Sequence, residues 1–542
     1  INKTNKVKMK QTMKQHSFIS CLKSLAVVFG MALAFASCAN EDVPLNPTNP
    51  NEDNDKNLTT FMAGGETRTS LNYDSGDFYW SAGDYIFVKD DDGVLQKSKN
   101  APDKKVAYFN YKVPGKFTAS SSYKVYYLGK NSNGSSVTIS TAQSQTAPDN
   151  TEHFGIAGDY GTATATGAVG GGAFSFQLEH HPAYLVFQPY TSNTILRNCK
   201  LAKVEVTSDN DIAETYTFNP TTGALDASAV TDGKQIILTT KDPVWGSSNY
   251  NGFPLTNNSV SVTTNGAYMV IKPGTHTLRV RYWVKDVATQ VEGTITKIYP
   301  STAYASNTYY DMTANLDLKN YDGDHYYMWD AKEQYWKGYE WTKKLPAGVG
   351  QPTLNNGLPN AIASSNYAQS NTDPRYYHKG GGPSLRFDAT QSCATLPNAN
   401  ELSWYGKYGD PRWDADELWT TMGHLYKGGM WFKKKSVLQA DGHYDTEKSV
   451  NGADWRTNGY GNNWPASQTL PSAADANKYF YLPALGCYGD GQLDDVGLVG
   501  YYWSSSAYSW GITYAYNLRF NRNYVEVGHY GRGLGFRVGG FE

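Results

Sequence analysis

The closing stretch of the chain, residues 479–541, consists of short apolar runs separated by Gly and Asn. Two of these runs end in Leu482-Pro483 and Trp503-Ser504, and three short alternating segments follow them. Alternation of apolar and polar residues over four to eight positions is typical of β-strands, and Gly and Asn favour the turns between strands. The pattern argues against a helical fold here, and we predict a small β-rich domain.

Short runs of β-branched and aromatic residues continue this pattern through most of the chain. Its 542 residues predict about three domains. We expect a mainly β fold with two β-sandwiches in series, at residues 58–190 and 191–318, and an α+β domain at residues 319–542. The nearly balanced charge, 48 Lys and Arg against 50 Asp and Glu, argues against a nucleic-acid partner, because such a partner requires a basic face.

The start of the chain carries an export signal. A basic segment precedes an apolar run at residues 24–37, which is too short to span a membrane and is typical of a secretory signal peptide. The small residues before Cys38 resemble a bacterial lipobox, with Cys38 as the lipidated residue. We expect residues 1–37 to comprise an upstream segment and this signal, with Met13 as the start of translation and Met9 as the other option. Residues 38–57 are expected to form a tether. The alternative is an ordinary signal peptide with an incidental Cys.

Four segments of the predicted first sandwich follow one another in a defined order. They are the strand-like Leu58–Ala63, the Thr-Arg-Thr triplet around Arg68, the aromatic run at residues 78–88 and the apolar run at residues 173–187. Together they resemble the fimbrillin family, whose members are the subunits of Bacteroidetes pili. The resemblance implies that both sandwiches are of fimbrillin type and that the partners are other fimbrillin subunits.

The resemblance also implies how such a subunit assembles. In the fimbrillin family a trypsin-like protease removes the first strand, and a strand from a neighbouring subunit fills the groove. The expected cleavage site is Arg68, with Lys56 as the second candidate, and the removable strand consists of Leu58, Thr59, Thr60, Phe61, Met62 and Ala63. The alternative role of Arg68 is that of a solvated turn residue. Because the second sandwich continues into another domain, the subunit would accept a strand without donating one, which suits a pilus tip.

The predicted third domain carries a second resemblance. Residues 480–484, 500–506 and 532–538 resemble the Fibrobacter succinogenes major paralogous domain, which is similar to C-type lectin-like domains. The resemblance implies a C-type lectin-like head that binds a ligand outside the cell.

Two short helices are predicted within this head. Asn398 with Glu401, and Asp414 with Glu417, have the spacing of a capping box, in which side chains satisfy the free amides at a helix start. The second helix would contain residues 418–426. Helices ahead of a strand-loop-strand ending are the order expected of the lectin-like fold.

Tryptophan is concentrated in the predicted head. Eleven of the 14 Trp lie between residues 329 and 510. Exposed aromatic rings bind ligands through apolar and stacking contacts. The predicted ligand-binding residues are therefore Trp413, Trp464, Trp503 and Trp510, and the alternative role of each is a core residue.

One group of carboxylates is a candidate metal site. Asp490, Asp494 and Asp495 offer oxygens for calcium, but the Gly and distal Glu of an EF-hand loop are missing. The sugar-calcium signatures of C-type lectins are also missing, so a polar turn is the favoured alternative. No other cofactor is expected. The sequence also lacks a nucleophile elbow and a carboxylate pair free of capping or turn roles, so we do not expect an enzyme.

The cysteines of the predicted head leave two alternatives open. Cys393 and Cys487 form one disulfide, which an exported protein permits, or they remain two separate buried thiols.

These expectations combine into one function and one alternative. We expect a pilus tip or minor subunit that is exported through the periplasm and anchored in the outer membrane by the lipid on Cys38 before maturation. It would accept a strand from another fimbrillin and present a lectin-like head to a host or bacterial surface ligand. The alternative is a free-standing outer-membrane lipoprotein that binds glycans.

Overall fold

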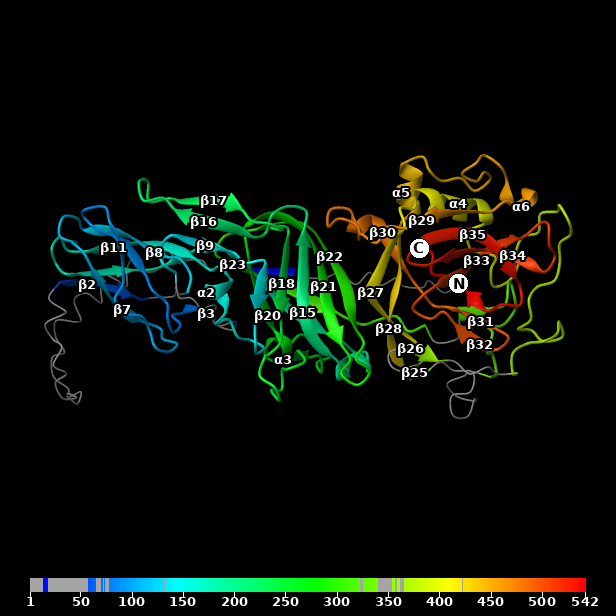
Figure 1. Ribbon diagram of the computed structural model, residues 1–542, viewed down its shortest axis with the longest axis horizontal. Helices are drawn as coiled ribbons and strands as arrows, with labels where there is room; N and C mark the ends of the chain where they lie inside the picture. The colour runs from blue at the N-terminus through cyan, green and yellow to red at the C-terminus, as the bar shows by residue number, and fades with distance from the viewer. Residues whose placement is uncertain are drawn as a thin grey trace, which may run out of the picture.

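The chain forms an elongated, mainly β structure with several sheets (Figure 1). No helix among the described residues has the length and apolar character needed to cross a bilayer. The expected residues of lipidation and cleavage, Cys38, Lys56 and Arg68, lie outside the described part of the chain. This computed structural model describes residues 13–17, 57–64, 70–71, 73, 78–130, 132–321, 325–339, 353–355, 358–360, 365–421 and 423–542.

An eight-stranded sheet at one end of the molecule contains the strand that we predict to be removable. This strand, β2 (Leu58–Ala63), lies between β12 (Ala173–Phe176), which is parallel to it, and β7 (Phe109–Pro114), which is antiparallel. Phe61 of β2 is fully buried and stacks on Phe174 with the ring centroids 5.4 Å apart. The other strands of the sheet are β5 (Phe87–Lys89), β6 (Leu95–Lys97), β8 (Ser122–Tyr127), β11 (Gly161–Gly167) and β13 (Glu179–His180).

Two sheets share the large hydrophobic core in the middle of the molecule, and we call them the middle sandwich. The smaller sheet is built on β14 (Ala183–Tyr190), which pairs with β23 (Thr308–Asn315) and β20 (Ala267–Ile271), while β1 (Met13–Ser17) pairs with the other side of β23. The larger sheet contains β10 (Ala142–Ser144), β15 (Lys200–Ser208), β18 (Gln235–Thr239), β19 (Phe253–Pro254), β21 (Gly274–Lys285) and β22 (Glu292–Tyr304).

The position of β14 corrects the predicted boundary at residue 190. The prediction assigned β14 to the first sandwich, but both of its partner strands belong to the middle sandwich. Its residues are buried from Ala183 through Pro189, so β14 is covered on both faces. A strand with two buried faces lacks the alternation that would indicate which sheet it joins.

Smaller elements complete this half of the molecule. A three-stranded sheet lies along the first two cores (Figure 1). It consists of β9 (Ser136–Thr138), β16 (Glu214–Phe218) and β17 (Leu225–Ala229), and the short helices are α2 (Phe154–Ala157) and α3 (Val262–Asn265).

The described residues from 325 onward form the head, which has two aromatic-rich cores. Its central sheet has the strand order β24-β36-β33-β34-β35-β29. These strands are β24 (Tyr326–Tyr327), β29 (Asn462–Pro465), β33 (Gly500–Ala507), β34 (Tyr514–Phe520), β35 (Tyr524–Gly531) and β36 (Phe536–Arg537). Further elements of the head are α4 (Ala399–Tyr408), α5 (Lys435–Ala440), α6 (Trp455–Asn458), β25 (Thr353–Asn355), β26 (Leu358–Asn360), β27 (Arg412–Thr421), β28 (His424–Lys433), β30 (Tyr479–Pro483), β31 (Cys487–Gly489) and β32 (Gln492–Asp494).

One of the two predicted capping boxes is confirmed and the other is wrong. Asn398 accepts from the backbone N–H of Glu401, whose side chain accepts from the N–H of Asn398, and α4 follows. The second spacing lies within strand β27, and no helix follows it. Asp414 accepts from the backbone N–H of Glu417 at 3.2 Å, but it also accepts from Arg281 of β21. A contact from a distant strand therefore overrides the local capping signal.

The larger sheet of the middle sandwich continues into the head. β22 and β27 are parallel neighbours, with Thr294 beside Glu417, and β27 continues the sheet through β28 to β30. The head is thus joined to the middle sandwich through a sheet as well as through the chain.

Candidate functional site

Two of the four predicted ligand-binding tryptophans belong to the core. Trp503 has no exposed surface, stacks on Phe536 with centroids 4.2 Å apart, and donates from Nε1 to the carbonyl of Tyr327 at 2.8 Å. Trp413 is also buried. Neither side chain is available to a ligand, so the prediction of a binding role was wrong for these two residues. Both are core residues, which was the alternative.

The other two tryptophans differ in exposure. Trp464 is half-buried and lies parallel to the buried Trp455, with centroids 6.4 Å apart. Trp510 is 63% exposed. Of the four predicted residues, Trp510 alone presents most of its side chain to solvent.

Trp510 belongs to a larger exposed group that we call the aromatic surface. Trp510, Ile512, Tyr514 and Tyr460 are 63%, 55%, 44% and 50% exposed, respectively. Tyr460 lies in the loop after α6, Trp510 and Ile512 lie in the loop between β33 and β34, and Tyr514 is the first residue of β34. The aromatic surface is defined as Tyr460, Tyr508, Trp510, Ile512, Tyr514 and His529.

Contacts between the two loops hold the rings in place. The Tyr508 hydroxyl donates to the carbonyl of Gly459 at 3.3 Å. Tyr508 also stacks on His529 with centroids 3.7 Å apart, and Tyr514 meets the same imidazole edge-on at 5.6 Å. The rings of Tyr508, Tyr514 and His529 are therefore held in place before any ligand arrives, which lowers the entropy cost of binding.

Gly459 gives Trp510 its position. Its φ of +67° lies in the left-handed region, and a Cβ atom there would meet the Trp510 ring at 2.9 Å. The indole ring therefore lies directly over the glycine backbone, where no larger residue leaves room for it.

The aromatic surface is uncharged. None of its residues is acidic, Lys or Arg, and burial lowers the pKa of His529 below its usual range, so the imidazole is neutral at pH 7. Aromatic faces with phenolic hydroxyls suit a neutral ligand that offers both apolar and hydroxyl groups. Of this group, only Trp510 was predicted from the sequence. The signal for the rest was the loop of aromatic, Ser and Gly residues at 508–514, which resembles the composition of antibody binding loops.

The three candidate calcium ligands have other roles. Asp490 and Gly491 form the two-residue turn between β31 and β32, and both have positive φ. Asp494 accepts from Gln492 at 3.2 Å, and Asp495 accepts from the Tyr501 hydroxyl at 3.0 Å. No group of three or more metal-ligating His, Cys, Asp or Glu occurs in the described part of the chain. The geometry gives these carboxylates turn and hydrogen-bond roles.

Cys393 and Cys487 do not form the disulfide that was one of the two alternatives. Both are free thiols, as is Cys199. Cys393 Sγ accepts from the backbone N–H of Asp330 at 3.3 Å. Burial raises the pKa of both head thiols to about 12, so they are protonated at neutral pH.

A buried polar cluster joins the middle sandwich to the head. Arg281 of β21 donates to Asp414 Oδ1 at 2.8 Å and to the Thr294 hydroxyl at 2.7 Å. Glu417 accepts from Thr294 at 2.9 Å and from the N–H and hydroxyl of Thr296 at 2.9 and 2.6 Å. Each of these contacts except that between Arg281 and Thr294 crosses from β21 or β22 to β27.

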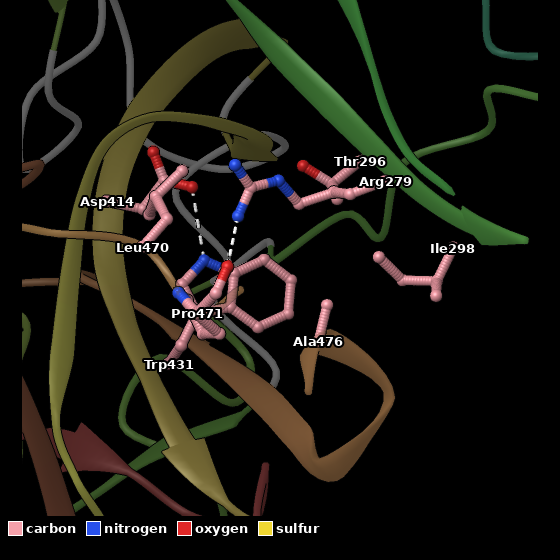
Figure 2. Close-up of a pocket in the computed structure, with 8 residues that line it drawn as sticks. All are labelled: Arg279, Thr296, Ile298, Asp414, Trp431, Leu470, Pro471 and Ala476. Atoms are coloured by element: carbon pink, nitrogen blue, oxygen red, sulfur yellow. Dashed lines mark hydrogen bonds between the residues drawn. The ribbon is translucent and has the colours of Figure 1, made fainter. Parts of the chain in front are cut away.

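Beside this cluster lies a small cavity, shown in Figure 2. Arg279 reaches from β21 to the carbonyl of Pro471, and Trp431 Nε1 donates to Asp414 Oδ2 at 3.1 Å. The cavity volume of about 20 Å³ accommodates one water molecule but no organic ligand. We conclude that the cluster is a structural joint and not a binding pocket.

The charge of this joint depends on pH. Burial, together with the neighbouring Asp414, raises the pKa of Glu417 to about 7, and the opposing effect of the Arg281 guanidinium only partly offsets this rise. Folding therefore favours protonated Glu417, and this contribution is fully present below the unfolded pKa of about 4.5 and is lost as the pH rises to about 7.

We expect the free energy of unfolding to fall by about 2 kcal/mol between pH 5 and 7.5 because of this group. Glu417→Gln mimics the protonated form and should remove that part of the pH dependence. Denaturant titrations of both proteins at a series of pH values measure the difference. Identical pH profiles for the two proteins would contradict the prediction.

Comparisons with known proteins leave the family open. No protein family model matches the sequence, and no curated protein matches it. Three similar solved structures are a candidate cell adhesion protein from Bacteroides ovatus, the fimbrial anchor protein Mfa2 from Porphyromonas gingivalis and a fimbrial protein from Bacteroides ovatus. Their identities to this chain are 15%, 13% and 12%, and their TM-scores are 0.30, 0.20 and 0.22. The matches cover 48%, 44% and 89% of this chain and 93%, 82% and 99% of those chains. Scores this low do not establish a shared fold.

Proposed function

We propose that this chain is a pilus tip or minor subunit of fimbrillin type, with a C-type lectin-like head that binds a surface ligand. The aromatic surface is the observation that carries the proposal. Its loops adjoin α6 and the start of β34, and these elements lie at the end of the molecule opposite β2 (Figure 1). A subunit that joins its fibre at one end and binds at the other needs this separation.

The position of β2 supports assembly by strand addition. β2 pairs with six residues of β7 and four of β12, so its removal would leave a groove with two open strand edges and the space vacated by Phe61. A strand from a neighbouring fimbrillin fits such a groove, because it restores the backbone hydrogen bonds on both sides. Export through the periplasm, lipidation at Cys38 and cleavage at Arg68 or Lys56 belong to the same proposal.

The mature N-terminus tests the assembly. We expect mass spectrometry of the protein from sheared surface fibres to find a start at Thr69, or at Asn57 after cleavage at Lys56, with other pilins attached. A start at lipidated Cys38, with none of the chain in fibres, would leave the free-standing glycan-binding lipoprotein as the function.

Replacement of Trp510 tests the head. Trp510→Ala should reduce adhesion of fibre-bearing cells to printed neutral glycans and to epithelial or bacterial cells at least 10-fold, while the amount of fibre stays constant. Trp245, which is 83% exposed on the middle sandwich, provides the matched control. Trp245→Ala should leave adhesion unchanged. Equal effects of the two variants on adhesion would mean that the aromatic surface is not the binding site.

A further inference from the structure

A second concave region on the head lies apart from the aromatic surface. The loop at residues 337–339 and the loop at residues 369–375 border a shallow, open depression of about 530 Å³. This volume is within the range of sites that bind small molecules. Its lining includes one exposed aromatic ring, that of Tyr339, and several side chains that form hydrogen bonds.

The Tyr339 ring rests on a fixed cation. The Arg375 guanidinium lies 4.7 Å from the ring centroid, while Tyr339 remains 44% exposed. Arg375 itself is almost fully buried and is held by Asp373, to which Nε donates at 3.0 Å and Nη2 at 2.7 Å. Its Nη1 donates to the carbonyl of Asn366 at 2.9 Å. The ring is therefore a supported platform with part of its surface open to a ligand.

The polar groups around the platform favour a hydroxylated anion. Because Arg375 and Asp373 neutralise each other, the ammonium of Lys337, which has no ion-pair partner among the described residues, leaves the depression with a net positive charge. Ser370 and Thr372 share a hydrogen bond of 2.8 Å and have lone pairs free for ligand hydroxyls. Gln369 donates to the carbonyl of Ser365, which leaves its amide oxygen free to accept.

We propose that this depression binds a carboxylated sugar, such as a hexuronic acid residue of an acidic polysaccharide. The residue can be at the end of the polysaccharide chain or within it. The apolar face of the sugar ring lies on Tyr339, the carboxylate faces Lys337, and the hydroxyl groups meet Ser370, Thr372 and Gln369. The site is separate from the uncharged aromatic surface and does not depend on assembly into fibres.

Isothermal titration calorimetry of the purified protein tests this site. The ligands are trigalacturonic acid and its carboxyl-reduced, neutral counterpart. We expect the acidic trisaccharide to bind at least 5-fold more tightly than the neutral one, with an affinity that falls as salt concentration rises. Lys337→Gln should remove this preference, and Tyr339→Ala should weaken both ligands at least 10-fold.

Two control variants distinguish binding in the depression from a general effect of surface charge and from binding at the aromatic surface. Lys332→Gln removes an exposed positive charge that does not line the depression, and Trp510→Ala changes only the aromatic surface. Both should bind the acidic trisaccharide as the unchanged protein does. Equal affinity for the two trisaccharides, no binding at all, or equal losses in Lys332→Gln and Lys337→Gln would overturn the proposal.

Discussion

Replacing Arg281 by methionine should lower the free energy of unfolding by about 3–5 kcal/mol. Arg281 is buried and is the guanidinium that pairs with Asp414, and Glu417 lies in the same cluster. Methionine fills much of the same volume but removes the guanidinium that pairs with the buried Asp414. Such uncompensated buried charge is among the most destabilising changes that a single substitution produces.

An exposed ion pair provides the control for Arg281→Met. Arg386 Nε lies 2.7 Å from Asp388 Oδ2, and the two side chains are 43% and 42% exposed. Arg386→Met should therefore cost less than about 1 kcal/mol. Denaturant unfolding followed by tryptophan fluorescence compares both variants with the unchanged protein. A cost for Arg281→Met as small as that for Arg386→Met would mean that the joint contributes little to stability.

Trp503→Ala should destabilise the head by about 3–5 kcal/mol, since it leaves a large cavity in the core and removes the hydrogen bond to Tyr327. Trp510→Ala, at an exposed position, should change the free energy of unfolding by less than about 0.5 kcal/mol. Unfolding of both variants is measured under one set of conditions. Together with the adhesion measurement, this comparison of unfolding distinguishes a tryptophan that stabilises the head, Trp503, from one that contacts a ligand, Trp510. A small effect of Trp503→Ala would contradict the buried position.

The sequence predicts strands better than it predicts their partners. β2 and α4 are recognisable because local signals, a strand-like run and a capping box, agree with the structure. The spacing of Asp414 and Glu417 gives the same helical signal, but these carboxylates meet Arg281 and Thr296 on distant strands. No local pattern encodes a contact of that sequence separation, and strand β27 forms instead.

The candidate site shows the same limit. Trp503 and Trp510 are close in the sequence and both precede Ser or Gly, yet one is in the core and the other is on the surface. Burial of Trp503 depends on Phe536, and exposure of Trp510 depends on Gly459, which supports the ring from another loop. Composition predicts an aromatic binding head, but only the packing of loops identifies which rings remain exposed.

Tension along the long axis of the molecule loads the contacts between β22 and β27 together. A single residue pair, Thr294 with Glu417, joins the two strands, and the side chains of Arg281, Asp414 and Thr296 bridge the same place. Because these contacts are concentrated at one place between the two strands, a pull on the head loads all of them. The joint should thus yield abruptly at a threshold force, and Arg281→Met should lower that threshold in single-molecule pulling.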